Sequence, residues 1–304
     1  MKILITGGTG FIGSALLPLL NEHQLTLLTR EPAQAEKRFG HQHQYLRSLA
    51  TLSNLDGFDA VINLAGEPIA GARWTMRKKR AICDSRWDTT QKLAALCNSG
   101  VAPPKIWLNA SAIGIYGPRD AEPVDETTPC PALDFAAQVC ERWELLAKRV
   151  EPHCRLYLLR IGLVLHPEGG ALNKMLPAFR LGLGGPIGNG RQMMSWIHRS
   201  DLLGLILHLI NNAPPAGIYN ATSPNPISNR EFSTALGHAL HRPAKLPAPS
   251  FVLKAALGEM SELLLTGQAV LPRAALASGF EFRFPQLEPA LQDLLSAAAT
   301  PRTD

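Results

Sequence analysis

The sequence has no long apolar run, and none of its hydrophobic stretches approaches the roughly 20 residues that cross a bilayer as a helix. Met1 and Lys2 lead directly into a short apolar segment, which leaves no room for a signal peptide ahead of it. We therefore expect a cytoplasmic protein with no membrane partner.

Cysteines in paired spacing are also missing. The chain has five cysteines, an odd number, and their separations match neither a disulfide framework nor a zinc-binding motif. They are Cys83, Cys97, Cys130, Cys140 and Cys154. This distribution is typical of a reducing compartment, and the sequence predicts no metal site.

The sequence also lacks a large excess of positive or negative charge. The formal net charge is +5, and charged residues make up 18% of the chain. The densest basic stretch, Arg77–Arg80, has no aromatic residues between its cations, which indicates a solvated helix face. We expect no nucleic-acid partner.

What the chain does contain is a regular alternation of short apolar segments and helical patterns. Its 304 residues, 46% of them hydrophobic, can bury the core of a large α/β domain. We predict strands over 2–6, 25–29, 60–64, 106–110 and 156–161, and helices over 11–21, 77–99 and 134–149. This order predicts a Rossmann-type, doubly wound parallel sheet over residues 1–165, with later sheet elements from 195–225.

The character of the chain changes after residue 165. Glycine and proline turn signals become frequent, and helical patterns recur over 228–240, 251–265 and 287–297. We interpret residues 166–304 as a smaller C-terminal lobe on the substrate side. Within it, the glycine-rich stretch 184–192 is expected to form a wall of the substrate site.

A glycine loop follows the first strand. Gly7, Gly10 and Gly13 have the GxxGxxG spacing, in which the first glycine permits a tight turn and the second a close approach to pyrophosphate. The third allows the following helix to pack on the strand. The sequence thus predicts a nicotinamide cofactor on the N-terminus of that helix. The predicted contacts in the loop are Gly7, Thr9, Gly10, Phe11, Ile12 and Gly13.

The second strand ends in Thr29 and Arg30, where NAD-preferring proteins usually carry an acid. A guanidinium there can pair with a 2′-phosphate, and Lys37 and Arg38 follow closely, so we predict NADP(H). The alternative is an ordinary surface arginine. Small residues after the third central strand should also line the cofactor site, namely Leu64, Ala65 and Gly66.

Two later segments extend this pattern. The segment Ala110–Gly117 resembles the catalytic-serine strand of the extended short-chain dehydrogenase/reductase superfamily, and Ser195–Asp201 resembles its later Phe-Ile-His element. That superfamily includes sugar-nucleotide epimerases and dehydratases. The resemblance implies a Rossmann fold and a Tyr-x-x-x-Lys pair as acid and base on the helix over 134–149.

The chain departs from the family at that pair. Aligning Glu144 with the glutamate that commonly follows the family's lysine puts Cys140 at the lysine and Ala136 at the tyrosine, and Arg86 stands in the segment of a supporting asparagine. Such replacements resemble the atypical YfcH-like branch, whose members are called epimerase-like and whose C-terminal lobe the end of this chain also resembles. The resemblance further implies a homodimer through the helices near 80–98 and 134–149.

Three residues are candidates for the missing chemistry. Ser111 could hydrogen-bond a substrate oxygen, or it could bond local backbone at the strand end. Cys140 could act as an acid or nucleophile if Arg86 lowered its pKa, or it could be a small buried hydrophobe. Tyr116 could replace the phenolic acid, or it could be structural. Arg160 ends a strand at the same edge and is expected to contact the cofactor or substrate.

Two functions remain open on the sequence. The first is an NADP(H)-dependent oxidoreductase or epimerase-like enzyme that acts on a small polar molecule such as a carbohydrate derivative. The second is a catalytically silent NADP(H)-binding module that reports redox state to a protein partner. An intact glycine loop supports cofactor binding in both, whereas the missing Tyr/Lys pair weakens the case for ordinary catalysis.

Overall fold

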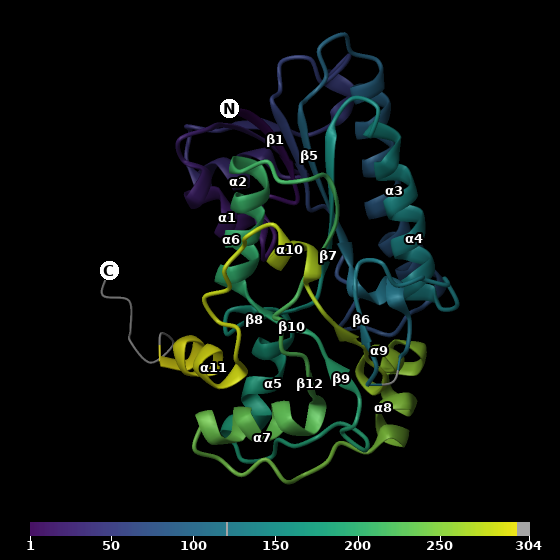
Figure 1. Cartoon of the computed structure of the whole chain (residues 1–304), viewed down its shortest axis with the longest axis vertical. Coiled ribbons are helices and arrows are strands. Elements are labelled where there is room, and N and C mark those ends of the chain that lie inside the picture. Colours follow the sequence, from purple (N-terminus) through teal and green to yellow (C-terminus); the bar gives the residue numbers. More distant parts are fainter. Residues whose placement is uncertain (120, 297–304) are drawn as a thin grey trace.

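A sheet of parallel strands forms the centre of the protein, whose computed structural model describes residues 1–119 and 121–296 (Figure 1). Its seven strands are β1 (Lys2–Thr6), β2 (Gln24–Leu28), β3 (Gln44–Leu46), β4 (Ala60–Asn63), β5 (Ile106–Ala112), β7 (Arg155–Ile161) and β11 (Gly217–Ala221). Across the sheet their order is β3-β2-β1-β4-β5-β7-β11, and all neighbours pair in parallel. The chain winds outward from β1 in both directions, so the predicted doubly wound α/β fold is confirmed.

Both faces of the sheet are buried, which explains why its strands are apolar along most of their length. In β1, Ile3 and Ile5 belong to one core and Leu4 to the other, since successive side chains point to opposite faces. The helices α3 (Met76–Asn98) and α4 (Phe135–Ala147) lie side by side over the Leu4 face (Figure 1). The opposite face is covered by α1 (Gly13–Leu16) and α6 (Arg199–Asn211).

The long helices α3 and α4 begin at side chains that cap them. The hydroxyl of Thr75 accepts a hydrogen bond from the backbone N–H of Lys78 at 3.2 Å, and the carboxylate of Asp134 accepts one from Ala137 at 2.8 Å. The two helices expected here are therefore confirmed. Among the described residues, no helix combines the length and apolar composition that a membrane crossing requires.

The first helix is shorter than the sequence predicts, and the expectation of a helix over 11–21 is wrong in its extent. After α1 the chain tightens into a 3₁₀ turn over Leu17–Leu20. Pro18 explains the change, because proline has no backbone N–H for the preceding turn and its ring crowds the carbonyl four residues back. Phe11 and Ile12 consequently lie in the loop before the helix.

A smaller lobe lies against the carboxyl edge of the sheet, in the lower half of Figure 1. Its core contains Trp196 and Phe232, which are fully buried. Outside the main sheet the strand pairs are β8 (Leu163–His166) with β10 (Trp196–His198), β9 (Met193–Met194) with β12 (Ile227–Ser228), and β6 (Pro123–Val124) with β13 (Ala269–Val270). The remaining helices are α2 (Pro32–Phe39), α5 (Gly170–Arg180), α7 (Asn229–Ala239), α8 (Ser250–Leu257), α9 (Glu262–Leu265), α10 (Arg273–Ala277) and α11 (Leu287–Ser296).

Two expectations for the second half need correction. Of the later sheet elements expected over 195–225, only β11 joins the main sheet, whereas β10 pairs with β8 beside it. The single helix expected over 251–265 is interrupted, because Gly258 has a φ of +59° and ends α8. The helix expected over 287–297 is α11, and residue 297 lies outside the described residues.

The packing of α1 on the loop before it depends on Gly13, and this generates a prediction. A Cβ on Gly13 would overlap the carbonyl oxygen of Gly7 and lie 2.6 Å from the Cα of Gly8. We expect Gly13→Ala to lower the free energy of unfolding by about 1–3 kcal/mol through overpacking, as measured by urea denaturation.

The matched control is Gly204→Ala in α6. A Cβ there would make ordinary contacts at 3.5 Å with the ring of Phe280, so the helix propensity of alanine should stabilise this variant by about 0.5–1 kcal/mol. Equal effects of the two substitutions would contradict the packing role of Gly13.

Candidate active site

The glycine loop lies where the strand order reverses, between β1 and the end of β4. Gly7 has a φ of +69°, and a Cβ at this position would lie 2.5 Å from the carbonyl oxygen of Leu64. Only glycine fits so close an approach in this conformation. In doubly wound sheets, ligands bind in the crevice at this switch point, beyond the carboxyl ends of the strands.

The loop also carries backbone donors with no partner. The N–H groups of Phe11 and Ile12 have no acceptor among the described residues, and both residues are half-buried, as is Thr9. Gly10 is exposed, and within 4 Å a Cβ on it would meet only the carbonyl oxygen of Gly7, at 3.2 Å. Unpaired N–H groups ahead of a helix, next to an open backbone, suit a phosphate group.

The other predicted cofactor residues come to the same edge because β2 and β4 flank β1. The segment 64–66 is tied to β1, since the N–H of Leu64 donates to the carbonyl oxygen of Thr6 at 3.1 Å and that of Ala65 donates to its hydroxyl at 3.2 Å. Arg30 follows β2 directly and is exposed, with Thr29 half-buried beside it.

The charges around this edge are mostly positive. Arg30 makes no hydrogen bond or ion pair with any residue that the structure describes, but its charge helps to lower the pKa of Glu67. The larger cause of that shift is the hydrogen bond from Lys78, whose Nζ lies 2.7 Å from Oε1 of Glu67. The phosphate groups of a nucleotide bound at this edge would therefore lie near a positively charged surface.

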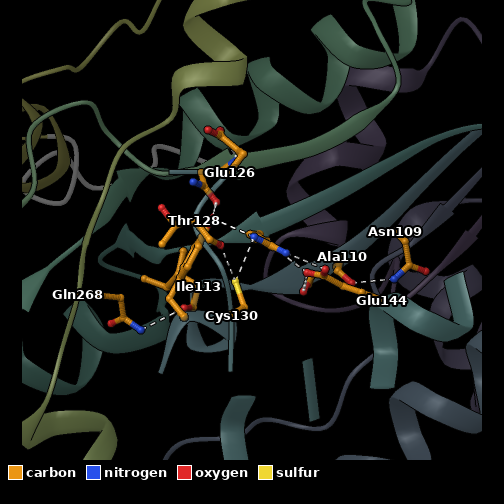
Figure 2. Close-up of polar contacts among 12 residues, drawn as sticks. Asn109, Ala110, Ile113, Glu126, Thr128, Cys130, Glu144 and Gln268 are labelled. Carbon is orange, nitrogen blue, oxygen red and sulfur yellow. Dashed lines mark hydrogen bonds and ion pairs between the residues drawn. The ribbon is translucent and has the colours of Figure 1, made fainter. Parts of the chain in front are cut away.

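Ser111, Tyr116 and Arg160 meet in a buried polar network, to which Glu144 and Cys130, both labelled in Figure 2, also belong. Its centre is the ion pair between Arg160 on β7 and Glu144 on α4, in which Nε and Nη2 donate to the two carboxylate oxygens at 2.9 Å each. Ser111 donates to the same carboxylate at 2.7 Å. All three residues are at most 4% exposed, so the hydroxyl of Ser111 is committed to the network.

Tyr116 belongs to the same network. Its hydroxyl donates to Oδ1 of Asn220 at 2.9 Å and accepts a hydrogen bond from Nη1 of Arg160 at 3.0 Å. Burial raises the pKa of Tyr116 to about 12, although the charge of Arg160 acts in the opposite direction. Burial alone would lower the pKa of Arg160, but hydrogen bonds and charge from Glu144 raise it. The cluster is thus a charge-balanced internal unit.

Cys140 lies nearby but outside these hydrogen bonds. It is 4% exposed and packs with Ile115 and Val124. Burial and the charge of Glu144 raise the pKa of this thiol to about 12, and the opposing charge of Arg86 is too weak to prevent it. The expectation that Arg86 would lower the thiol's pKa is therefore wrong in its net result. The geometry matches the alternative of a small buried hydrophobe.

Other polar groups of the lobe are structural. His198 caps α6 and stacks on Phe284 with ring centroids 4.2 Å apart. Burial lowers its pKa to about 4, so the ring is neutral near pH 7. No group of three or more His, Cys, Asp or Glu side chains suited to a metal occurs in 1–119 or 121–296. The stretch 184–192, expected to form a wall of the substrate site, packs on the chain near Leu246, whose N–H donates to the carbonyl oxygen of Gly184 at 3.2 Å.

The sequence did not predict that Glu144, Asn220 and Cys130 contact the residues of this network. Glu144 lies one helical turn after Cys140 on the buried face of α4. A carboxylate at that position of an amphipathic helix is a signal for a buried cation. Asn220 and Cys130 had no such signal, because they contact the network from distant strands and loops.

Comparison with known proteins identifies the same family over most of the chain. Residues 3–222 match the model described as "NAD dependent epimerase/dehydratase family", and residues 248–294 match "Domain of unknown function (DUF1731)". The "Epimerase family protein SDR39U1" of Mus musculus is 38% identical over 301 residues, which cover 97% of this chain and 100% of that protein.

Solved structures agree with this. The crystal structure of human epimerase family protein SDR39U1 with NADPH has a TM-score of 0.90 and 38% identity, and the match covers 97% of this chain and 99% of that one. UDP-glucuronic acid 4-epimerase from Bacillus cereus, in complex with UDP-glucuronic acid and NAD, has a TM-score of 0.76 over 98% of this chain and all of that chain. At 18% identity, this second match shows the fold alone.

The central ion pair generates a testable prediction. Glu144→Gln keeps the size of the side chain but leaves the guanidinium of Arg160 buried without a counter-ion, so we expect the free energy of unfolding to fall by about 3–5 kcal/mol. Urea denaturation of the variant measures the change.

The control is Asp84→Asn, the same chemical change in an exposed pair, where Arg80 lies 3.5 Å from Asp84 on α3. It should leave stability nearly unchanged. Adding Arg160→Met to Glu144→Gln should recover part of the loss, because the unpaired charge is then gone. A small effect of Glu144→Gln would show that the pair is not a stability determinant.

Proposed function

The chain belongs to the NAD-dependent epimerase/dehydratase family, and from that premise we propose that it binds NADP(H) across the carboxyl edge of β1, β2 and β4. The observation that carries the proposal is the pair of unpaired N–H groups at Phe11 and Ile12, beside the open backbone of Gly10. They would hold the pyrophosphate through charge-assisted hydrogen bonds, with no side chain in the way.

The phosphorylated form of the cofactor is supported by Arg30. Its exposed guanidinium stands where an acid would accept the ribose hydroxyls of NAD, and an arginine can donate two parallel hydrogen bonds to a 2′-phosphate. Lys78 adds positive charge to the same region, although Glu67 neutralises part of it. The relative whose crystal structure contains NADPH points in the same direction.

We propose further that the protein is an oxidoreductase or epimerase-like enzyme for a small polar substrate. Bound nicotinamide supplies a site for hydride transfer. The residues of this chain would orient the cofactor, exclude water with the lobe, and bind the substrate. Ser111 and Tyr116 would act in this scheme by holding the sheet edge in place, since their hydroxyls are already engaged with Glu144 and Asn220.

A second candidate function is favoured by the burial of the three candidate catalytic side chains. Ser111, Cys140 and Tyr116 are each at most 4% exposed, and burial keeps the Tyr116 and Cys140 side chains protonated near pH 7. A family member whose candidate acids and bases are buried in this way could bind NADP(H) without turnover and act through a protein partner.

Cofactor preference tests the role of Arg30. We expect Arg30→Ala to weaken NADPH binding by about tenfold or more, because it removes a charge-assisted pair with the 2′-phosphate, and to change NADH binding less than about twofold. Titrations followed by nicotinamide fluorescence measure both constants. Gly10→Val is the reference variant, since its side chain would fill the open backbone and should abolish binding of both cofactors. A parallel loss of both cofactors in Arg30→Ala would contradict the assignment.

Turnover separates the two candidate functions. If the protein is an oxidoreductase, NADPH absorbance should fall when the wild type is mixed with a panel of aldehydes and ketones. If it is epimerase-like, NADPH absorbance should stay constant while nucleotide sugars are converted to epimers, which NMR distinguishes although their mass is unchanged. Gly10→Val should be inactive in both assays. Tight NADPH binding with neither NADPH oxidation nor a new epimer would favour the silent module.

A further inference from the structure

Two arginines border the proposed site, and their surroundings differ. All three nitrogens of the Arg160 guanidinium are hydrogen-bonded, two of them to Glu144 and the third to Tyr116. Its positive charge is balanced by a carboxylate within the protein. Arg160 is therefore buried and already neutralised, which leaves it little attraction for an anionic ligand.

Arg86 on α3 is held by neutral groups instead. Its Nη1 donates to the backbone carbonyl oxygens of Glu67 at 3.0 Å and Ile82 at 3.1 Å, and its guanidinium carbon lies 5.1 Å from the centre of the Trp143 ring. No described carboxylate lies within ion-pair distance of it, and the side chain of Glu67 is paired with Lys78 at 2.7 Å. Arg86 is thus a half-buried cation without a counter-ion.

The free part of the Arg86 guanidinium remains accessible. Nε and Nη2 have no acceptor among the described residues, and neither belongs to the fully buried polar atoms that lack a partner. Because the guanidinium is planar and anchored at Nη1, these two N–H groups are fixed in direction. They form the bidentate edge with which arginine binds phosphate or carboxylate.

The guanidinium lies directly against Gly66, just beyond the end of β4. A Cβ on Gly66 would be 2.9 Å from both Cζ and Nη2 of Arg86, so glycine leaves the room that this side chain occupies. Arg86 also lies near Cys140, and its charge opposes the rise in the pKa of that thiol. A cation on α3 therefore lies close to the position where the resemblance to the family would place a lysine.

Electrostatics explains what such a group needs. Burial is the largest influence on the pKa of Arg86 and lowers it, and the charge of Glu67, which lies beyond ion-pair distance, offsets only part of this effect. A ligand oxygen with negative charge would restore the lost solvation and gain a strong hydrogen bond. The 2′-phosphate is not available for this, because it is assigned to Arg30.

We propose that Nε and Nη2 of Arg86 bind an anionic oxygen of a ligand above Gly66. This rests on the proposed function, because the site is the one that would hold NADP(H). The anion belongs either to the pyrophosphate of the cofactor or to a phosphate or carboxylate of the substrate. In both cases Arg86 is a binding residue of the site. If its role were purely structural, Arg86 would contact only the two carbonyl groups and Trp143, and no ligand.

The test compares Arg86→Gln with Arg80→Gln, a control on the same helix whose guanidinium is exposed and paired only with Asp84 at 3.5 Å. In the first arm, NADPH and 2′,5′-ADP, which lacks the nicotinamide half, are titrated into each protein. If the anion is the cofactor's pyrophosphate, Arg86→Gln should weaken NADPH by about tenfold or more, and Arg80→Gln should match the wild type. Because 2′,5′-ADP keeps the adenosine-side phosphate, its binding should weaken as much as that of NADPH if Arg86 binds that phosphate, and clearly less if Arg86 binds the nicotinamide-side phosphate.

In the second arm, inorganic phosphate is titrated by calorimetry into the NADPH-saturated protein and into the protein alone. If the anion belongs to the substrate, the wild type should bind phosphate in the presence of NADPH, and Arg86→Gln should lose this binding while NADPH affinity is unchanged. Arg86→Lys keeps the charge but not the bidentate edge. It should therefore bind NADPH or phosphate, whichever ligand Arg86→Gln binds more weakly, with part of the wild-type affinity. If Arg86→Gln folds poorly, the affinities of Arg86→Lys test the role of Arg86 instead.

The outcomes separate the two proposals. Arg86→Gln and Arg86→Lys that bind NADPH, 2′,5′-ADP and phosphate as the wild type does would overturn the role of Arg86. A wild type that binds no NADPH would overturn the proposed function, and the titration of phosphate into the protein alone would then decide whether Arg86 binds an anion.

Discussion

The buried ion pair between Glu144 and Arg160 is the interaction on which the rest of the site depends. It joins α4 to β7 in a region from which water is excluded, with both side chains 5% exposed. Removing two charges from water is costly, and the cost is offset only because both carboxylate oxygens and all three guanidinium nitrogens find partners. Those partners include Ser111, which lies in the segment that resembles the family's catalytic-serine strand, and Tyr116, the sequence's candidate for a substitute phenolic acid.

That network changes the chemistry expected of the site. In the wider family a lysine beside a tyrosine makes a phenol available as acid or base, which requires access and a pKa near neutrality. Here the tyrosine of the turn after β5 is buried with a pKa of about 12, and a buried thiol stands at the lysine position. Positive charge reaches the region from α3 through Arg86. The region therefore contains a cation from α3, while the hydroxyls of Ser111 and Tyr116 form hydrogen bonds within the fold.

Cofactor binding is less affected by this rearrangement, because it depends mostly on backbone. The turn at Gly7, the packing of Gly13 and the free N–H groups of Phe11 and Ile12 do not involve the network. A protein built in this way can preserve nucleotide binding while the groups for proton transfer diverge. This separation is consistent with both proposed functions.

The amino-acid sequence by itself determined the features that are local along the chain. The apolar strands, the capped helices α3 and α4, the GxxGxxG loop and the basic residue after β2 each depend on a few neighbouring residues, and each lies as the sequence predicts. The first helix is an exception, because the helical pattern continues to residue 21 while Pro18 changes the last turn to a 3₁₀ turn.

Only the tertiary structure decided which polar side chains are free for chemistry. Ser111 and Glu144 are 33 residues apart, and Tyr116 and Asn220 are 104 apart, so their hydrogen bonds follow from how α4 and β11 pack beside β5 and β7. A serine at a strand end has the same local pattern whether it faces a substrate or a buried carboxylate. Tertiary packing decides which partner the serine has. A buried charge without a partner is strongly destabilising, so the polar groups that the fold places nearby form hydrogen bonds with that charge.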